Sequence, residues 1–224
     1  NSNTYSSSTL INGDIVTCNL TSNDPCASPL TATSNSIVMT VNPVLVPTIS
    51  IVAAPAGAIC AGTNVTFTAS ITNGGASPTY QWQVNGANVG INSNTYSSST
   101  LANGNTVTCI LTSNALCASP VTVTSNSIVM VVDPVLVPTI SIVAVPAGAI
   151  CLGTNVTFTA SITNGGAGPV YQWQVNGGNV GINANTYSSG ALNNGDIVTC
   201  ILTSNALCAS PASVTSNSIT MIVT

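Results

Sequence analysis

The chain has 224 residues and almost no charge: it contains no Lys, Arg or His, and its four acidic residues are Asp14, Asp24, Asp133 and Asp196. Charged residues make up 2% of the sequence, whereas a soluble domain usually carries about 25%. Because Lys and Arg neutralise phosphates, and Lys and His supply amine and imidazole catalysis, the composition excludes nucleic-acid binding and those classes of enzyme. No apolar run approaches the roughly 20 residues of a membrane span, so we expect no such span in this segment.

The sequence repeats with a period of 91 residues. Residues 44–91 differ from residues 135–182 at 5 of 48 positions, and residues 1–43 differ from residues 92–134 at 10 of 43. A period of this length is typical of a small independent domain and is too long for a solenoid repeat.

The repeat predicts three blocks. Residues 44–134 and 135–224 each form a complete repeat, and residues 1–43 form the C-terminal half of another. We expect the front half of that first repeat to come from continuation of the chain upstream, or alternatively from strands of another chain.

Each complete block predicts a series of short β-strands. Apolar residues alternate with Thr, Ser and Gln, and the runs are rich in β-branched and aromatic residues. Asn-Gly pairs between the runs favour hairpin turns. In the middle block the predicted strands cover residues 46–53, 63–72, 78–85, 87–92, 94–101, 105–113 and 121–132. This pattern predicts an all-β fold of tandem β-sandwich domains.

The predicted core is built around one tryptophan in each complete block. We expect Trp82 in the middle of strand 78–85, beside Phe67, with Trp173 and Phe158 in the same places one period later. Cys109 would face Trp82 from strand 105–113.

Two proline-bracketed segments join the blocks, residues 42–47 and 133–138, and neither contains a Gly/Ser stretch. Such linkers are extended and semi-rigid, so we expect successive domains to form a rod-like array.

Several motifs of the middle block together resemble the tandem immunoglobulin-like repeats of very large secreted surface proteins of Bacteroidota, and the resemblance extends over the whole chain. The motifs lie at residues 59–69, 78–86, 95–97, 101–104 and 107–114. The resemblance implies immunoglobulin-like sandwiches in an extracellular array that serves as an adhesin, stalk or fibre. Val107 replaces the usual strand-F tyrosine, and Phe67 stands where the usual disulfide would need a cysteine.

The eight cysteines predict disulfides, because the chain has no His and no close CxxC pair for zinc. Cys60 precedes strand 63–72 and Cys117 follows strand 105–113, and these strand ends lie at the same end of a sandwich. We therefore predict a Cys60–Cys117 disulfide and, one period later, a Cys151–Cys208 disulfide. Cys26 is left unpaired or paired outside the sequence.

Cys18, Cys109 and Cys200 are the third set of cysteines related by the period. We predict that they are buried free thiols packed beside tryptophan. The alternative is a Cys60–Cys109 disulfide that leaves Cys117 exposed for linkage to another chain.

We predict no catalytic, cofactor-binding or metal-binding residues and no enzymatic activity. The four aspartates do not form the carboxylate groupings that calcium or hydrolysis needs, and the blocks do not keep them, so we expect them to cap turns. Gln81 and Gln83 are expected to be cross-strand polar residues, although they could also contact a glycan or a neighbouring chain.

The predicted function is that of an extracellular structural protein, on or outside the cell surface, which forms or packs into a filament or stalk. Its expected partners are other copies of itself, with glycans as a second class, because a nearly uncharged surface resists association poorly. The alternative is a surface adhesin in which these repeats are passive spacers or glycan-binding modules.

Overall fold

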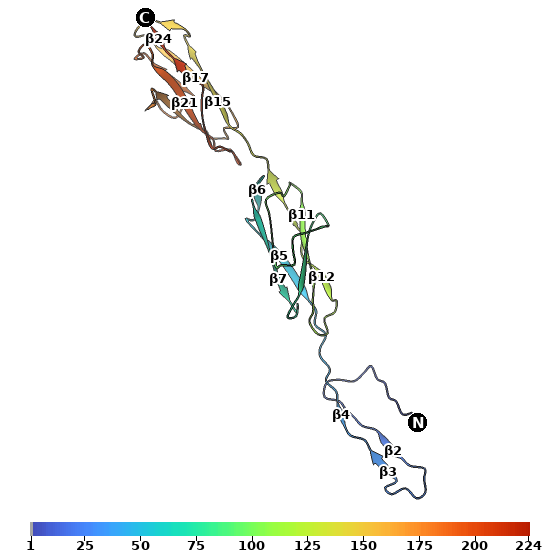
Figure 1. Ribbon diagram of the computed structural model, residues 1–224. Coiled ribbons are helices and arrows are strands. Elements are labelled where there is room, and N and C mark those ends of the chain that lie inside the picture. The colour runs from blue at the N-terminus through green and yellow to red at the C-terminus, as the bar shows by residue number, and fades with distance from the viewer. Residues whose placement is uncertain (1) are drawn as a thin grey trace. The chain divides into compact units, whose positions relative to one another are not determined.

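The computed structural model describes residues 2–224 and consists of strands and turns, with no helix in that range (Figure 1). The prediction of an all-β fold is confirmed. Contacts divide the chain into two compact units. The first comprises the residues up to Val52 together with Phe67–Tyr96 and Val107–Ile128, and the second comprises Ala53–Thr66, Ser97–Thr106 and Val129–Thr224. The second unit therefore contains both the last block and the segment that carries Cys60.

The N-terminal block forms two short antiparallel ladders. In the first, β1 (Ile15–Val16) pairs with β4 (Ile37–Val38), and in the second β2 (Asn19–Thr21) pairs with β3 (Thr31–Thr33). Most large apolar side chains of these strands are exposed, and Leu20 is an example, whereas Val16 is half-buried.

The strands of the middle block form three sheets. The first has the order β10-β7-β5, and the second has the order β12-β11-β8-β9, with β13 also pairing with β11. The third is a parallel pair of β6 and β14. The strands are β5 (Thr48–Ala54), β6 (Ala58–Cys60), β7 (Val65–Thr72), β8 (Thr79–Val84), β9 (Ala87–Val89), β10 (Thr95–Ser98), β11 (Thr106–Thr112), β12 (Thr122–Thr124), β13 (Ile128–Val129) and β14 (Val131–Asp133).

The last block repeats this arrangement. Its sheets have the orders β15-β17-β20 and β19-β18-β21-β22, with β23 pairing with β21, and β16 and β24 form the parallel pair. The strands are β15 (Thr139–Val145), β16 (Ala149–Ile150), β17 (Val156–Thr163), β18 (Val170–Val175), β19 (Gly178–Val180), β20 (Thr186–Ser189), β21 (Ile197–Thr203), β22 (Ser213–Thr215), β23 (Ile219–Thr220) and β24 (Ile222–Val223).

An aromatic cluster joins the two larger sheets of the middle block. Phe67 lies on β7 and Trp82 on β8, both are fully buried, and their ring centroids are 6.2 Å apart. Tyr96 of β10 lies 6.0 Å from Phe67 and 5.9 Å from Trp82. The Trp82 indole N–H donates a hydrogen bond to the Ser93 carbonyl at 2.9 Å, so the polar atom of this buried ring is satisfied. Side chains from both sheets therefore share one core.

The last block contains the same cluster, made by Phe158, Trp173 and Tyr187 at centroid distances of 6.2, 6.0 and 5.9 Å. Phe158 and Trp173 are fully buried. In the middle block Gly90 lies against Tyr96: its φ is +68°, and a Cβ atom there would lie 3.0 Å from the tyrosine ring. Glycine is required both by this backbone conformation and by the close ring.

Two features depart from the predicted strands. The sequence did not predict β6, and the predicted strand 121–132 is divided into β12, β13 and β14. The first break contains Asn126, which turns its side chain to β5, and the second, at Met130, lies where the chain passes from pairing with β11 to pairing with β6. The Asn126 Oδ1 accepts a hydrogen bond from the Ile51 N–H at 2.8 Å, and its Nδ2 donates to the Ile51 carbonyl at 3.1 Å. Asn126 thus links β5 to the strand segments of the other sheet.

Replacing Asn126 with alanine should lower the free energy of unfolding of the middle block. The change leaves both backbone polar groups of the buried Ile51 without this partner, which costs about 1–3 kcal/mol for a buried group. The measurement is urea unfolding followed by tryptophan fluorescence in a Trp173→Phe background, where Trp82 alone reports.

The matched control is Asn88→Ala, which removes an exposed side-chain hydrogen bond to Gln83. We expect a change within about 0.5 kcal/mol for this surface substitution. Equal effects of the two substitutions would contradict the role given to Asn126.

Candidate functional site

The most distinctive chemical feature of the structure is a disulfide between two different blocks. Cys60, at the end of β6, is bonded to Cys208 of the last block, with a Cα–Cα distance of 5.4 Å and a sequence separation of 148 residues. Both cysteines belong to the second compact unit. We call the site the stapled junction; it consists of Cys60, residues 133–136 and Cys208.

Backbone hydrogen bonds hold the two cysteines of this site beside the two ends of segment 133–136. On one side β14 runs parallel to β6 with Asp133 opposite Cys60, and the Ala61 N–H donates to the Asp133 carbonyl at 2.8 Å. On the other side the Leu136 N–H donates to the Cys208 carbonyl at 3.0 Å. The short segment 133–136 is therefore held beside Cys60 at its start and beside Cys208 at its end, which brings the two sulfur atoms together.

The predicted Cys60–Cys117 and Cys151–Cys208 disulfides are not formed in the structure, where Cys117 and Cys151 are free and exposed. The prediction assumed that both cysteines of a pair lie at one end of the same sandwich. Instead Cys60 aligns with Val131–Asp133 near the end of its block, whereas Cys117 aligns with the start of the block, where the Leu45 N–H donates to the Cys117 carbonyl at 3.0 Å. The pairing of β6 is what distinguishes the two cysteines, and β6 was not evident from the sequence because a strand this short shows no periodic pattern.

Cys109 and Cys200 are free thiols in the core, and each lies directly opposite a tryptophan in the strand register, Trp82 and Trp173 respectively. The proposed Cys60–Cys109 alternative is therefore also absent. Burial removes the thiols from water and raises the pKa of each to about 11, against an ordinary value of 9.0, although a backbone hydrogen bond with Gln81 or Gln172 acts in the opposite direction. Both thiols stay protonated at neutral pH.

Cys18 differs from its two counterparts because it is exposed, which corrects the prediction that it is buried. The strands that cover Cys109 and Cys200 lie in the front halves of their blocks, and residues 1–43 contain no such half. Cys26 is also exposed and free.

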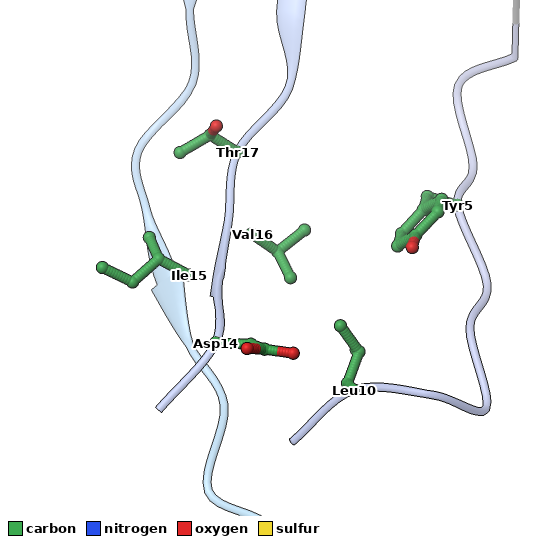
Figure 2. A pocket seen from close by; sticks show the side chains of 6 residues that line it. All are labelled: Tyr5, Leu10, Asp14, Ile15, Val16 and Thr17. Atoms are coloured by element: carbon green, nitrogen blue, oxygen red, sulfur yellow. The ribbon is translucent and has the colours of Figure 1, made fainter. Parts of the chain in front are cut away.

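A hollow of about 380 Å³ lies in the N-terminal block (Figure 2). Leu10 and Val16 point toward the space in front of Tyr5, and Ile15 points away from it. One period later the counterparts of Leu10 and Val16 are Leu101 and Val107, which are 7% and 0% exposed. The apolar part of the lining thus corresponds to core positions of the middle block, whereas Asp14 and Thr17 make the rest of it polar.

Asp14, Asp24 and Asp196 accept hydrogen bonds in turns, as predicted, whereas Asp133 lies at the end of β14. The Asp14 carboxylate accepts the Ile11 N–H at 2.9 Å, and Asp196 accepts the Asn193 N–H at 2.8 Å. Asn105 makes the same bond to the Ala102 N–H, so this turn needs an oxygen and not a charge. The Asn193 backbone and the Asn176 side chain donate to the Asp196 carboxylate and hold its pKa below the ordinary value.

Gln83 is a cross-strand polar residue, and its Nε2 donates to Asn88, its partner in the register, at 2.9 Å. Between residues 2 and 224 the structure gathers no group of three or more His, Cys, Asp or Glu side chains that could hold a metal ion. The same residues include no helix of the length and apolarity needed to cross a membrane.

Comparisons with models of known protein families and with curated proteins find no match to this chain.

Peptide mapping of the unreduced protein should show Cys60 linked to Cys208. The protein is first alkylated without reduction. It is then digested with chymotrypsin, because a chain without Lys or Arg offers trypsin no cleavage site. Cys60→Ser should leave Cys208 open to alkylation, whereas the control Cys117→Ser should leave the linkage intact. Recovery of a peptide joining Cys60 to Cys117 would show that the disulfide has been assigned to the wrong partner.

Cys109 and Cys200 should resist iodoacetamide at pH 8 in the folded protein and react after unfolding, whereas the exposed Cys117 and Cys151 should react at once. Their raised pKa also sets a pH dependence. Because the folded state binds the thiol protons more tightly, the stabilisation is complete below pH 9 and is lost as the pH rises through about 11.

The free energy of unfolding of the wild type should therefore fall in this pH range relative to a Cys109→Ala, Cys200→Ala double variant. The measurement is denaturant unfolding at a series of pH values. Parallel curves for the two proteins would contradict the burial of these thiols.

Proposed function

We propose that the chain is an extracellular structural repeat protein whose blocks are immunoglobulin-like sandwiches and which forms, or packs into, a filament or stalk. The observation that carries the proposal is the Cys60–Cys208 disulfide, which joins two blocks by a second covalent connection besides the peptide linker. A connection between blocks adds no catalytic or binding group. Its direct effect is on how firmly one block is held to the next.

The strand partners support the assignment of immunoglobulin-like blocks. In that fold one sheet contains strands A, B and E and the other contains C, F and G, with C′ added in the variable type. The order β10-β7-β5 corresponds to E-B-A, and β9-β8-β11-β12 corresponds to C′-C-F-G. The aromatic cluster of Phe67, Trp82 and Tyr96 provides the shared core that such a pair of sheets requires.

The disulfide supports a mechanical role. The loop that it closes spans 148 residues, and in the chain-entropy model a loop of this size stabilises the folded state by about 5 kcal/mol. Tension that reaches the stapled junction is shared by segment 133–136 and by the sulfur–sulfur bond. Repetition of nearly identical blocks adds length without adding a new site.

The surface supports packing against other copies of the same chain. Ile91 and Ile182, one period apart, are 80% and 79% exposed, and Val52 and Val143 form a second pair of exposed apolar residues. The same apolar side chain thus recurs at the same place in successive blocks. With a formal net charge of −4 on 224 residues, little electrostatic repulsion opposes the approach of two copies.

A structural disulfide supports an extracellular location, because such bonds persist in oxidising compartments and are rare where thiols are kept reduced. The resemblance to secreted repeat proteins points in the same direction.

Electron microscopy of the secreted protein tests the proposal. We expect ordered fibres with an axial repeat of one or two domain lengths. Ile91→Asp and Ile182→Asp together should reduce fibre formation, because they place charge on the recurring apolar positions.

The matched control is Asn105→Asp, which adds a charge while keeping the turn hydrogen bond and which reproduces the residue found at Asp14 and Asp196. It should leave fibres unchanged. Monodisperse single molecules for the wild type would contradict a filament, and binding of an isolated block to glycans would favour the adhesin alternative.

A further inference from the structure

We infer that the stapled junction recurs once per period, and that Cys117 and Cys151 are half-sites for disulfides to the neighbouring blocks of the same chain. Cys117 takes the cysteine that corresponds to Cys60 in the preceding block, and Cys151 takes the cysteine that corresponds to Cys208 in the following block. The inference concerns covalent linkage and holds whether or not the chain forms filaments.

Cys151 lies 91 residues after Cys60, and Cys117 lies 91 residues before Cys208. The two free cysteines are therefore the period-related counterparts of the two bonded ones. The observed bond joins a cysteine of the Cys60 type to one of the Cys208 type 148 residues later in the chain. Cys117 comes before Cys151 and lies only 34 residues from it, so a disulfide that obeys the period cannot join these two.

Cys151 has the same backbone surroundings as the bonded Cys60. Beside Cys60 the Ala61 N–H donates to the Asp133 carbonyl at 2.8 Å, and beside Cys151 the Leu152 N–H donates to the Thr224 carbonyl at 3.3 Å. The parallel pair of β6 and β14 is matched by that of β16 and β24. The final strand of the last block thus lies alongside β16 and Cys151, as β14 lies alongside β6 and Cys60 in the middle block.

Cys117 likewise has the surroundings of the bonded Cys208. Leu45 donates to the Cys117 carbonyl and Leu136 to the Cys208 carbonyl, both at 3.0 Å. The φ angles of Cys117 and Cys208 are +65° and +63°, a conformation uncommon outside glycine. The free cysteine is held in the same backbone conformation as the bonded one.

Two further observations fit a bonding role at the free positions. Cys117 and Cys151 are exposed, so their sulfur atoms are open to a partner, whereas Cys60 and Cys208 are half-buried. A hollow of about 220 Å³ is lined by Asn42, Pro43, Leu45 and Leu116, and Leu116 directly precedes Cys117 in the sequence.

The chemistry is thiol–disulfide exchange. The Sγ atoms of the two cysteines lose two protons and two electrons as their bond forms, and an external disulfide is reduced to two thiols in the same reaction. In the experiment oxidised glutathione is that oxidant.

The experiment lengthens the chain by one period at its C-terminal end or by the front half of a repeat at its N-terminal end. In the first protein a second copy of residues 134–224 follows Thr224, and in the second a copy of residues 44–91 precedes residue 1, so that the period continues without a break. Each protein is oxidised with glutathione in dilute solution, alkylated without reduction, digested with chymotrypsin and mapped by mass spectrometry.

We expect Cys151 of the first protein to be bonded to the appended copy of Cys208, and Cys117 of the second to be bonded to the added copy of Cys60. Alkylation of each is lost relative to the 224-residue chain, while the Cys60–Cys208 bond remains. Changing the appended or added cysteine to serine should restore the alkylation, and Cys200→Ser should not.

Two results would overturn the inference: alkylation of Cys151 and Cys117 as in the parent chain, or bonds from them to other cysteines. Oxidation of a mixture of ¹⁵N-labelled and unlabelled protein identifies bonds between separate molecules by mixed-isotope peptides, and their predominance would also overturn it. Because the assay needs no fibres, its outcome is independent of the test of the proposed function.

Discussion

Each complete block depends on the packing of one aromatic cluster, whose rings come from two different sheets. Phe67 and Tyr96 come from one sheet and Trp82 from the other, and no other large rings are present in the middle block to replace them except Tyr80. The N-terminal block, which lacks this cluster, shows what happens without it. It has Tyr5 but no tryptophan or phenylalanine, and Leu20 is 65% exposed where its counterpart Leu111 is fully buried.

Polar side-chain contacts between strands in this protein are hydrogen bonds between uncharged groups, where many proteins have ion pairs. Hydroxyl pairs such as Thr48 with Thr72 and Thr66 with Ser97 join neighbouring strands at 2.6 and 2.8 Å. Asn126 ties β5 to the opposite sheet, and a turn accepts either Asp or Asn because only the oxygen matters. Interactions of this kind depend little on salt, since no net charge is involved.

The alternation of residues such as Val65, Phe67 and Ala69 was enough to predict the longer strands and the burial of the core, because a strand with one buried face imposes a period of two. The sequence was less informative where this period is interrupted. A strand of three residues such as β6 has too few positions to show alternation, and Asn126 looks like any other polar residue of its run.

The disulfide pairing could not be derived from the sequence for a related reason. Spacing indicates which cysteines lie near the ends of strands, but it does not tell which linker a strand end lies beside. That choice is decided by the parallel pairing of β6 with β14, in which Asp133 lies opposite Cys60. In a repeat protein each cysteine also has counterparts in other blocks, so partners within one block and between blocks satisfy the spacing equally well.

The 148-residue loop also changes what happens when the backbone is cut. A protease that hydrolyses one peptide bond between Cys60 and Cys208 leaves two fragments that remain tethered through sulfur, so a single nick frees nothing. Release of a fragment requires two cuts inside the loop, or one cut followed by reduction. Damage by a protease therefore stays local in this part of the chain, and a reductant decides whether a nicked molecule comes apart.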